Sequence, residues 1–271
     1  MERGEAKMRM SDAQLRQYRE DGFVLIPECF TRQEIEAIRN EVPGLLSKES
    51  EARVLERNGR AVRAVHGCHL ENEIMRRLTV HPKLLEPAMQ IVASSLYVYQ
   101  FKINAKAGFD GEAWPWHQDF KHWYEEDGLS SPRTVSAALY LDDVTLFNGP
   151  LFMIPGSHTY GNWCQVTLKD SGWAAKYRAD LKYTMDKQTV TELIARNGIV
   201  STEAPRGSAL FFDVNVAHAS ASNISPFDRW IVIITYNSID NVPRAVQEPR
   251  AEFLVGQDYK PLRPVPWDFT H

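Results

Sequence analysis

The stretch Leu96-Tyr-Val-Tyr-Gln-Phe-Lys-Ile-Asn104 separates a helical first part of the chain from a β-rich remainder. Apolar and polar side chains alternate along it. Residues 97, 99, 101 and 103 fall on one face of an extended chain, and residues 100, 102 and 104 fall on the other. The alternation predicts a strand with one apolar face and one polar face.

Upstream of this stretch the sequence predicts three helices and one short strand. Ser11 with Gln14, and Thr31 with Glu34, are capping-box patterns that begin two helices. Pro82 begins a third helix, in which apolar residues recur at helical spacing. Between the first two helices, the apolar run 23–26 ends at a proline and predicts a strand.

Downstream, four β-rich runs are separated by turn signals containing glycine or proline. The runs are residues 134–141, 151–154, 208–212 and 230–236. We expect a single domain over residues 1–271, with a helical part at about 11–93 and an antiparallel β-sandwich or barrel at about 96–258. Residues 159–200 interrupt this pattern, include an expected helix near 189–197, and are either a lid or a mobile decoration.

Composition narrows the function classes. The 271 residues carry a formal net charge of -4 without a basic block, which disfavours nucleic acids and anionic membranes as partners. No apolar run approaches the roughly 18 residues needed to cross a bilayer. Three well-separated cysteines argue against a disulfide scaffold or a thiolate zinc site. We expect a cytoplasmic protein acting on a small molecule, and the oligomeric state stays open.

The run Trp116-His-Gln-Asp-Phe120 carries the first chemical signal. If it is extended, His117 and Asp119 point to the same side and present an imidazole and a carboxylate to one ion. His218, which follows a second apolar run, adds another imidazole. Two histidines and one carboxylate leave three coordination positions open, as in non-haem Fe(II) oxygenases. A structural zinc site would instead need a closed shell of four ligands.

Arg229 and Ser220 extend this hypothesis. Arg229 follows His218 beyond the Ser225-Pro226 turn, so a hairpin can bring it beside the metal. A guanidinium binds a carboxylate through two parallel hydrogen bonds and suits the distal carboxylate of 2-oxoglutarate. Ser220 lies on the strand face of His218 and adds a hydroxyl donor. The alternative for Arg229 is a surface ion pair with a neighbour such as Asp228.

Three longer stretches resemble the phytanoyl-CoA dioxygenase-like superfamily, and ectoine hydroxylases within it. They are residues 99–104, Tyr-Gln-Phe-Lys-Ile-Asn; residues 116–129, from Trp-His-Gln-Asp-Phe to Asp-Gly-Leu; and residues 147–158, Phe-Asn-Gly-Pro-Leu-Phe-Met-Ile-Pro-Gly-Ser-His. Bacterial hydroxylases of free L-leucine are also similar, and they share turns like Asn223-Ile-Ser-Pro-Phe227 and the run Ile234-Thr-Tyr-Asn237. The resemblance runs from about Asp12 to Asp258.

The resemblance implies a mainly β fold, a double-stranded β-helix (jelly roll) with flanking helices. It implies an enzyme that uses Fe(II), 2-oxoglutarate and O2 to hydroxylate its substrate. The implied iron ligands are His117, Asp119 and His218, and the implied 2-oxoglutarate clamp is Arg229 with Ser220. Gln100 and Asn104 match positions lining the cosubstrate and substrate pocket, and Trp123 matches an aromatic wall of that pocket.

The substrate expectation depends on one position. Ectoine hydroxylases carry an arginine where this chain has Lys102, and the leucine hydroxylases carry lysine. A lysine is a point charge and suits a carboxylate in a different pose. We therefore expect hydroxylation of a free aliphatic, leucine-like L-amino acid. The alternatives are an ectoine-type hydroxylase, one acting on isoleucine, proline or lysine, and, in another class, a non-catalytic sensor of metal and 2-oxoglutarate. Because Asp119 is a carboxylate, hydroxylation is favoured over chlorination.

Overall fold

The computed structural model describes residues 9–166 and 181–267. Four helices precede the long strand β4, and a 3-10 turn separates the second from the third. These are α1 (Asp12–Asp21), α2 (Arg32–Ser47), η1 (Cys68–Leu70), α3 (Glu73–Thr79) and α4 (Pro82–Val92). Both predicted capping boxes form, one at Ser11 with Gln14 and one at Thr31 with Glu34. The three predicted helices are thus confirmed, whereas α3 was not predicted.

Thirteen strands lie in the described residues. They are β1 (Phe23–Ile26), β2 (Arg53–Leu55), β3 (Val62–His66), β4 (Leu96–Lys106), β5 (Trp114–His117), β6 (Thr134–Tyr140), β7 (Leu151–Met153), β8 (Gln165–Val166), β9 (Tyr183–Thr184), β10 (Val200–Ser201), β11 (Ala209–Asp213), β12 (His218–Ser220) and β13 (Arg229–Ser238). The remaining helical elements are α5 (Asp119–Asp127), η2 (Ser157–Tyr160) and α6 (Lys187–Asn197). All four β-rich runs predicted downstream of residue 104 form strands.

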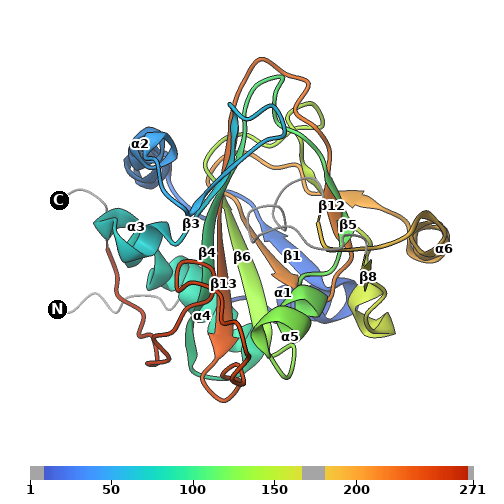
Figure 1. Cartoon of the computed structure of the whole chain (residues 1–271). Helices are drawn as coiled ribbons and strands as arrows, with labels where there is room; N and C mark the ends of the chain where they lie inside the picture. Colours follow the sequence, from blue (N-terminus) through green and yellow to red (C-terminus); the bar gives the residue numbers. More distant parts are fainter. Residues whose placement is uncertain (1–8, 167–180, 268–271) are drawn as a thin grey trace.

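Two antiparallel sheets face each other. The seven-stranded sheet has the order β1-β11-β6-β13-β4-β3-β2, and the four-stranded sheet has the order β10-β7-β12-β5. Side chains from both sheets meet in one apolar cluster, in which Ile231 and Phe212 of the large sheet join Leu151 and Met153 of the small sheet. Figure 1 shows β12 and β5 across from β4, β6 and β13. This is the expected jelly roll, a double-stranded β-helix.

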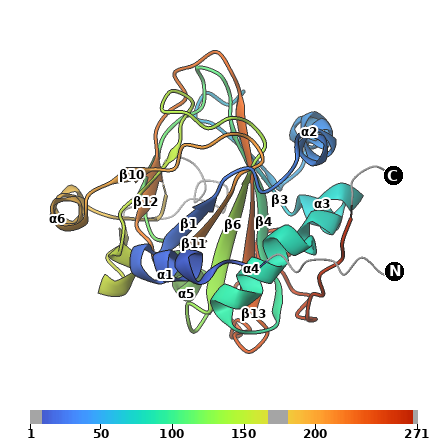
Figure 2. The ribbon, with the colours of Figure 1, turned by 180° about the vertical axis from the view of Figure 1, so that it is seen from behind.

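The N-terminal helices cover the outer face of the large sheet. Their buried residues, including Ile38 of α2 and Leu85 of α4, pack with Phe101, Ile103 and Val232 in the largest apolar cluster. Figure 2 shows α1 and α4 lying across that face. The central strands β6, β11 and β13 therefore have two buried faces, one against the helices and one toward the small sheet.

A β-bulge changes the predicted facing of β4. Thr235 of β13 pairs with Gln100 while Tyr236 pairs with Val98, so Tyr99 is an extra residue on β4. Tyr97 and Tyr99 consequently pack with Trp123 on the inner side, away from the helix-facing cluster that holds residues 101 and 103. The prediction that residues 97–103 share one apolar face is therefore wrong before residue 100 and holds after it.

The predicted interruption at 159–200 lies partly outside the described residues, because residues 167–180 are not among them. Within the described part, β8 pairs with β9, and α6 matches the predicted helix near 189–197. None of the helices in residues 9–166 and 181–267 is both long and apolar enough to cross a membrane. The three cysteines are free and buried.

Candidate metal centre

The His-x-Asp motif spans the end of a strand and the start of a helix. β5 ends at His117, Gln118 is the N-cap residue, and Asp119 is the first residue of α5. Asp119 is helical, but the intervening Gln118 is extended, so the predicted placement of His117 and Asp119 on the same side is confirmed. The amide of Gln118 points elsewhere, because its Nε2 donates to the carbonyls of Gly161 and Asn215.

β12 brings the second imidazole to this point. His218 pairs with His117 in antiparallel register, and the two ring centroids are 4.1 Å apart. Nε2 of His117 lies 3.8 Å from Oδ1 of Asp119, and Nε2 of His218 lies 4.0 Å from Oδ2. Two atoms that each bind one ion at about 2.1 Å are at most about 4.2 Å apart. The three side chains therefore have the spacing of ligands to one ion.

Backbone carbonyls fix which nitrogen of each imidazole is available. Nδ1 of His117 is 2.8 Å from the Pro115 oxygen, and Nδ1 of His218 is 3.0 Å from the Val216 oxygen. A carbonyl oxygen only accepts, so each Nδ1 carries the hydrogen. Each Nε2 then presents a lone pair toward Asp119, which is how outer contacts orient a metal-binding histidine.

The electrostatics match this protonation pattern. Burial, followed by the neighbouring His218, lowers the pKa of His117 to about 3. Burial also lowers the pKa of His218. Burial alone would raise the pKa of Asp119, but Lys102 and then the two imidazoles bring it below its ordinary value. Neutral imidazoles and an ionised carboxylate are the forms that bind a metal ion.

Arg229 lies on the large sheet, two residues beyond the pair that Ile231 forms with Asn104. It begins β13 and pairs with Lys106 on β4, whereas Asn104 pairs with Ile231. It is thus one inward-facing position, roughly 7 Å, beyond Asn104. Its guanidinium is 2% exposed and donates to the carbonyl of Gly149 at 2.6 Å. Burial lowers the pKa of Arg229 to about 10, which leaves it charged at neutral pH.

Lys106 is a buried cation that the sequence analysis missed. It is 2% exposed, and its Nζ donates to the carbonyls of Glu112 and Ala221. The chain makes room for it at Gly149, where a Cβ would lie 2.5 Å from the Lys106 side chain. The period-two pattern that placed residues 100, 102 and 104 on one face also includes residue 106, so the signal was present.

Two buried polar atoms near the three ligands have no hydrogen-bond partner among the described residues. They are Oγ of Ser220 and Oδ1 of Asn104. A buried polar atom without a partner is costly, so a bound polar molecule at this point would stabilise both. With Arg229 and Lys106 beyond them, the polar residues suit a small dicarboxylate lying along the inner face of the large sheet.

Two adjoining cavities share a wall at the three ligands. Lys102, Asn104, Trp114, His117 and Asp119 line both of them. One cavity also contacts His218, Phe212 and Ile233. The other extends past Gln100, His66, His122 and Trp123 to the segment 181–183. Arg229 lines neither cavity. Gln100 is held in place by a hydrogen bond from its Nε2 to the Leu254 carbonyl.

The acidic run at residues 125–127 ends α5, and Asp127 is buried. Arg250 binds Asp127 through two hydrogen bonds, and the hydroxyl of Tyr99 donates to the same carboxylate. Local sequence does not reveal this, because the partners are far away along the chain.

Comparison with known proteins agrees with this geometry. A model of the phytanoyl-CoA dioxygenase (PhyH) family matches residues 18–231. The L-proline trans-4-hydroxylase of Streptomyces griseoviridis is 36% identical, covering 95% of this chain and 96% of that protein. An ectoine dioxygenase of Bordetella bronchiseptica is also 36% identical, covering 94% and 86%. The crystal structure of EctD from S. alaskensis with 2-oxoglutarate and 5-hydroxyectoine aligns with a TM-score of 0.83 and 27% identity, covering 96% of this chain and 89% of that one.

Proposed function

The chain belongs to the phytanoyl-CoA dioxygenase family of iron- and 2-oxoglutarate-dependent dioxygenases, and on that premise we propose that it hydroxylates a free aliphatic L-amino acid. The observation that carries the proposal is the position of Lys102. This cation lies on the wall shared by the two cavities, beside the three candidate metal ligands. It can therefore hold an anionic group of a small substrate close to the metal.

His117, Asp119 and His218 would hold the iron and leave three positions for cosubstrate and oxygen. Bound iron and 2-oxoglutarate supply the oxidising chemistry, in which one atom of O2 enters a substrate C–H bond and the other enters succinate as CO2 is lost. Arg229 and Lys106 would hold the distal carboxylate of 2-oxoglutarate. Ser220 and Asn104, whose Oγ and Oδ1 have no hydrogen-bond partner among the described residues, would complete its binding site.

The second cavity would take the amino acid. Lys102 would bind the α-carboxylate through a charge-assisted hydrogen bond. Gln100, whose amide nitrogen is already engaged with Leu254, has an amide oxygen left to accept from the ammonium group. Trp114 and Trp123 offer apolar walls for an aliphatic side chain. Fixing both ends of the substrate selects which C–H bond faces the metal.

Leucine and its relatives are the first candidates, because a lysine at position 102 distinguishes leucine hydroxylases from ectoine hydroxylases. Proline is the second candidate. The observation that favours it is the relative from S. griseoviridis, which is an L-proline hydroxylase and matches nearly the whole chain. Ectoine is the third, since ectoine dioxygenases are similar over most of their length.

A panel experiment tests the proposal. The protein is incubated in air with Fe(II), 2-oxoglutarate and leucine, isoleucine, proline, lysine or ectoine, and products are identified by mass spectrometry. We expect one amino acid to gain one oxygen atom and to stimulate succinate release. With the D119N variant we expect neither the oxygenated product nor the stimulation. Stimulation by ectoine alone would contradict the role given to Lys102. No product from any compound, despite binding of metal and 2-oxoglutarate, would favour the sensor alternative.

A further inference from the structure

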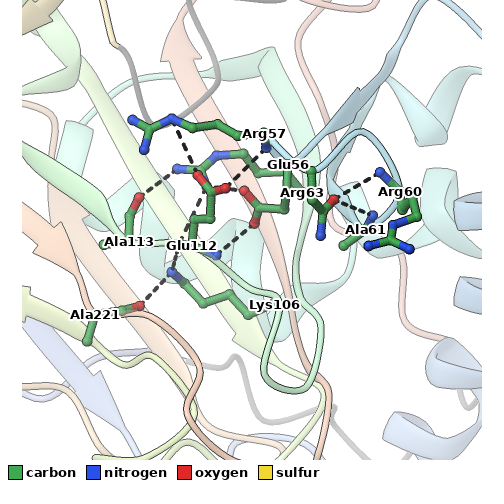
Figure 3. Close-up of polar contacts among 10 residues, drawn as sticks. Glu56, Arg57, Arg60, Ala61, Arg63, Lys106, Glu112, Ala113 and Ala221 are labelled. Atoms are coloured by element: carbon green, nitrogen blue, oxygen red, sulfur yellow. Dashed lines mark hydrogen bonds and ion pairs between the residues drawn. The ribbon is translucent and has the colours of Figure 1, made fainter.

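A buried ion pair lies next to the strand that carries His117. Glu56 follows β2, Arg63 lies on β3, and both side chains are 1% exposed. Nη1 of Arg63 donates to Oε2 of Glu56 at 2.6 Å (Figure 3). Removing two charges from water is costly unless the pair makes further well-placed hydrogen bonds. The other contacts of this pair therefore indicate what it does in the fold.

Those contacts fix the two residues that precede β5. Oε1 of Glu56 accepts from the backbone nitrogen of Glu112 at 3.1 Å. Nη2 of Arg63 donates to the Ala113 carbonyl at 3.0 Å, and Nη1 donates to the Glu112 carbonyl at 3.4 Å. Lys106 donates to the same Glu112 carbonyl, as Figure 3 shows. Side chains of the large sheet thus hold the backbone where the chain enters the small sheet.

The small sheet itself gives β5 little support. β5 is its edge strand and is paired with β12 in that sheet, while on its other side the Met185 N–H donates to the Trp116 carbonyl at 2.9 Å. The register contains two residue pairs, His117 with His218 and Trp114 with Ser220, and it is interrupted by a bulge between them. A short, bulged edge strand has few ladder hydrogen bonds to fix its position. The contacts made by Glu56 and Arg63 therefore add support at the N-terminal end of β5.

Arg63 also contacts the side chain of Trp114. Its guanidinium carbon lies 3.7 Å from the centroid of the indole, a cation–π stack. The indole lines both cavities at the metal centre, and its centroid is 6.3 Å from that of the His117 ring. The indole is consequently backed by a planar cation that is itself held by a buried carboxylate.

We propose that Arg63, held by Glu56, is a positioning residue that fixes Trp114 as a wall of the substrate cavity and thereby keeps 2-oxoglutarate consumption coupled to substrate hydroxylation. The inference rests on the proposed function. A displaced wall admits water and lets the substrate lie off its reactive position. Cosubstrate is then consumed without forming product. Arg63 touches no reacting atom and acts through Trp114 and the start of β5.

The test compares R63K and R63M with wild type and with K83M, which removes a partly buried cation on α4. Arginine stacks through a planar group that lysine lacks, so R63K keeps the charge but loses the stack. We expect product formed per succinate to fall at least about threefold in R63K and R63M and to stay at the wild-type value in K83M. R63K retains the charge balance with Glu56, so it remains informative if R63M does not fold.

Two further measurements separate positioning from general destabilisation. The visible charge-transfer band of the anaerobic Fe(II)–2-oxoglutarate complex should persist in R63K, because the metal ligands remain. W114F alone should lower the product formed per succinate. The double variant R63K/W114F should lower it no further than the single variant with the larger effect, since the two residues act as a unit. A wild-type ratio in R63K, additive effects in the double variant, or loss of the band would each overturn the proposal.

Failure of the proposed function would be visible separately. If wild type hydroxylates none of the amino acids, hydrogen exchange of residues 112–117 is measured in the anaerobic complex with Fe(II) and 2-oxoglutarate. Faster exchange at 112–117 in R63K, but not in K83M, supports the positioning role. Exchange at the wild-type rate in R63K contradicts it.

Discussion

Arg229 on β13 stands directly opposite Lys106 on β4, and each side chain is 2% exposed. Both donate to backbone carbonyls, and among the described residues neither forms an ion pair with a carboxylate. Burying two cationic groups side by side is costly, and an anion placed between or beside them would stabilise their charged forms. We therefore expect this pair to bind a carboxylate on the inner face of the large sheet.

Binding of 2-oxoglutarate should take up a proton. Burial, then Arg229 and Arg63, lowers the pKa of Lys106 to about 6, so the lysine is largely neutral at pH 7.5 in the absence of an anion. A bound carboxylate raises that pKa. Affinity is then greatest below about pH 6 and declines as pH rises toward the pKa of the complex.

Calorimetry of the anaerobic, metal-loaded protein in two buffers with different ionisation enthalpies measures this uptake. We expect up to one proton per 2-oxoglutarate at pH 7.5 in wild type and in K83M. K106M should bind 2-oxoglutarate more weakly and with no such uptake. Equal uptake in K106M and wild type would place the titrating group elsewhere.

Removing the metal should abolish turnover reversibly. Chelator-treated protein should release no succinate, and added Fe(II) should restore it. Asp119→Asn keeps the shape of the side chain but removes the negative charge, so Fe(II) should bind more weakly and activity should fall by more than about 100-fold even with excess iron. Retention of near-wild-type iron binding in both D119N and H218A would exclude these residues as ligands.

Lys102→Met should act on the amino-acid substrate. A hydrogen bond to a charged group contributes about 1.5–3 kcal/mol, so the KM for the amino acid should rise about 10- to 100-fold. The KM for 2-oxoglutarate should change little, and K102R should be less affected because it keeps the charge. Steady-state kinetics with each substrate varied in turn measures both. A rise confined to the KM for 2-oxoglutarate would assign Lys102 to the cosubstrate instead.

Breaking the Asp127–Arg250 pair should destabilise the fold strongly. The two side chains are 1% and 6% exposed, so Asp127→Asn leaves a buried guanidinium without its charge partner. Such a loss costs about 3–5 kcal/mol of unfolding free energy. Denaturant unfolding measures it. Glu36→Gln is the matched control, since its pair with Arg32 on α2 is exposed and should cost less than about 1 kcal/mol.

Local sequence determined the elements and the chemistry. The capping boxes at Ser11 and Thr31 form because their donors and acceptors are three residues apart, within one helical turn. The β-rich runs form strands because alternation and turn residues are also local signals. The residue types at 117, 119 and 218 indicated an open metal site, although the start of helix α5 at residue 119 was not predicted. Arg229 was singled out from the sequence because a guanidinium suits a carboxylate. Its buried position opposite Lys106 was not predicted.

Tertiary structure alone decided how distant segments meet. The bulge at Tyr99, which turns two tyrosines inward, arises from the register between β4 and β13. The burial of Asp127 depends on Arg250, and the support of β5 depends on the pair formed by Glu56 and Arg63. The physical reason is that a strand's register and a buried charge's partner are set by packing between chain segments that local propensity does not link. Sequence pattern specifies which groups are present, and packing specifies which of them touch.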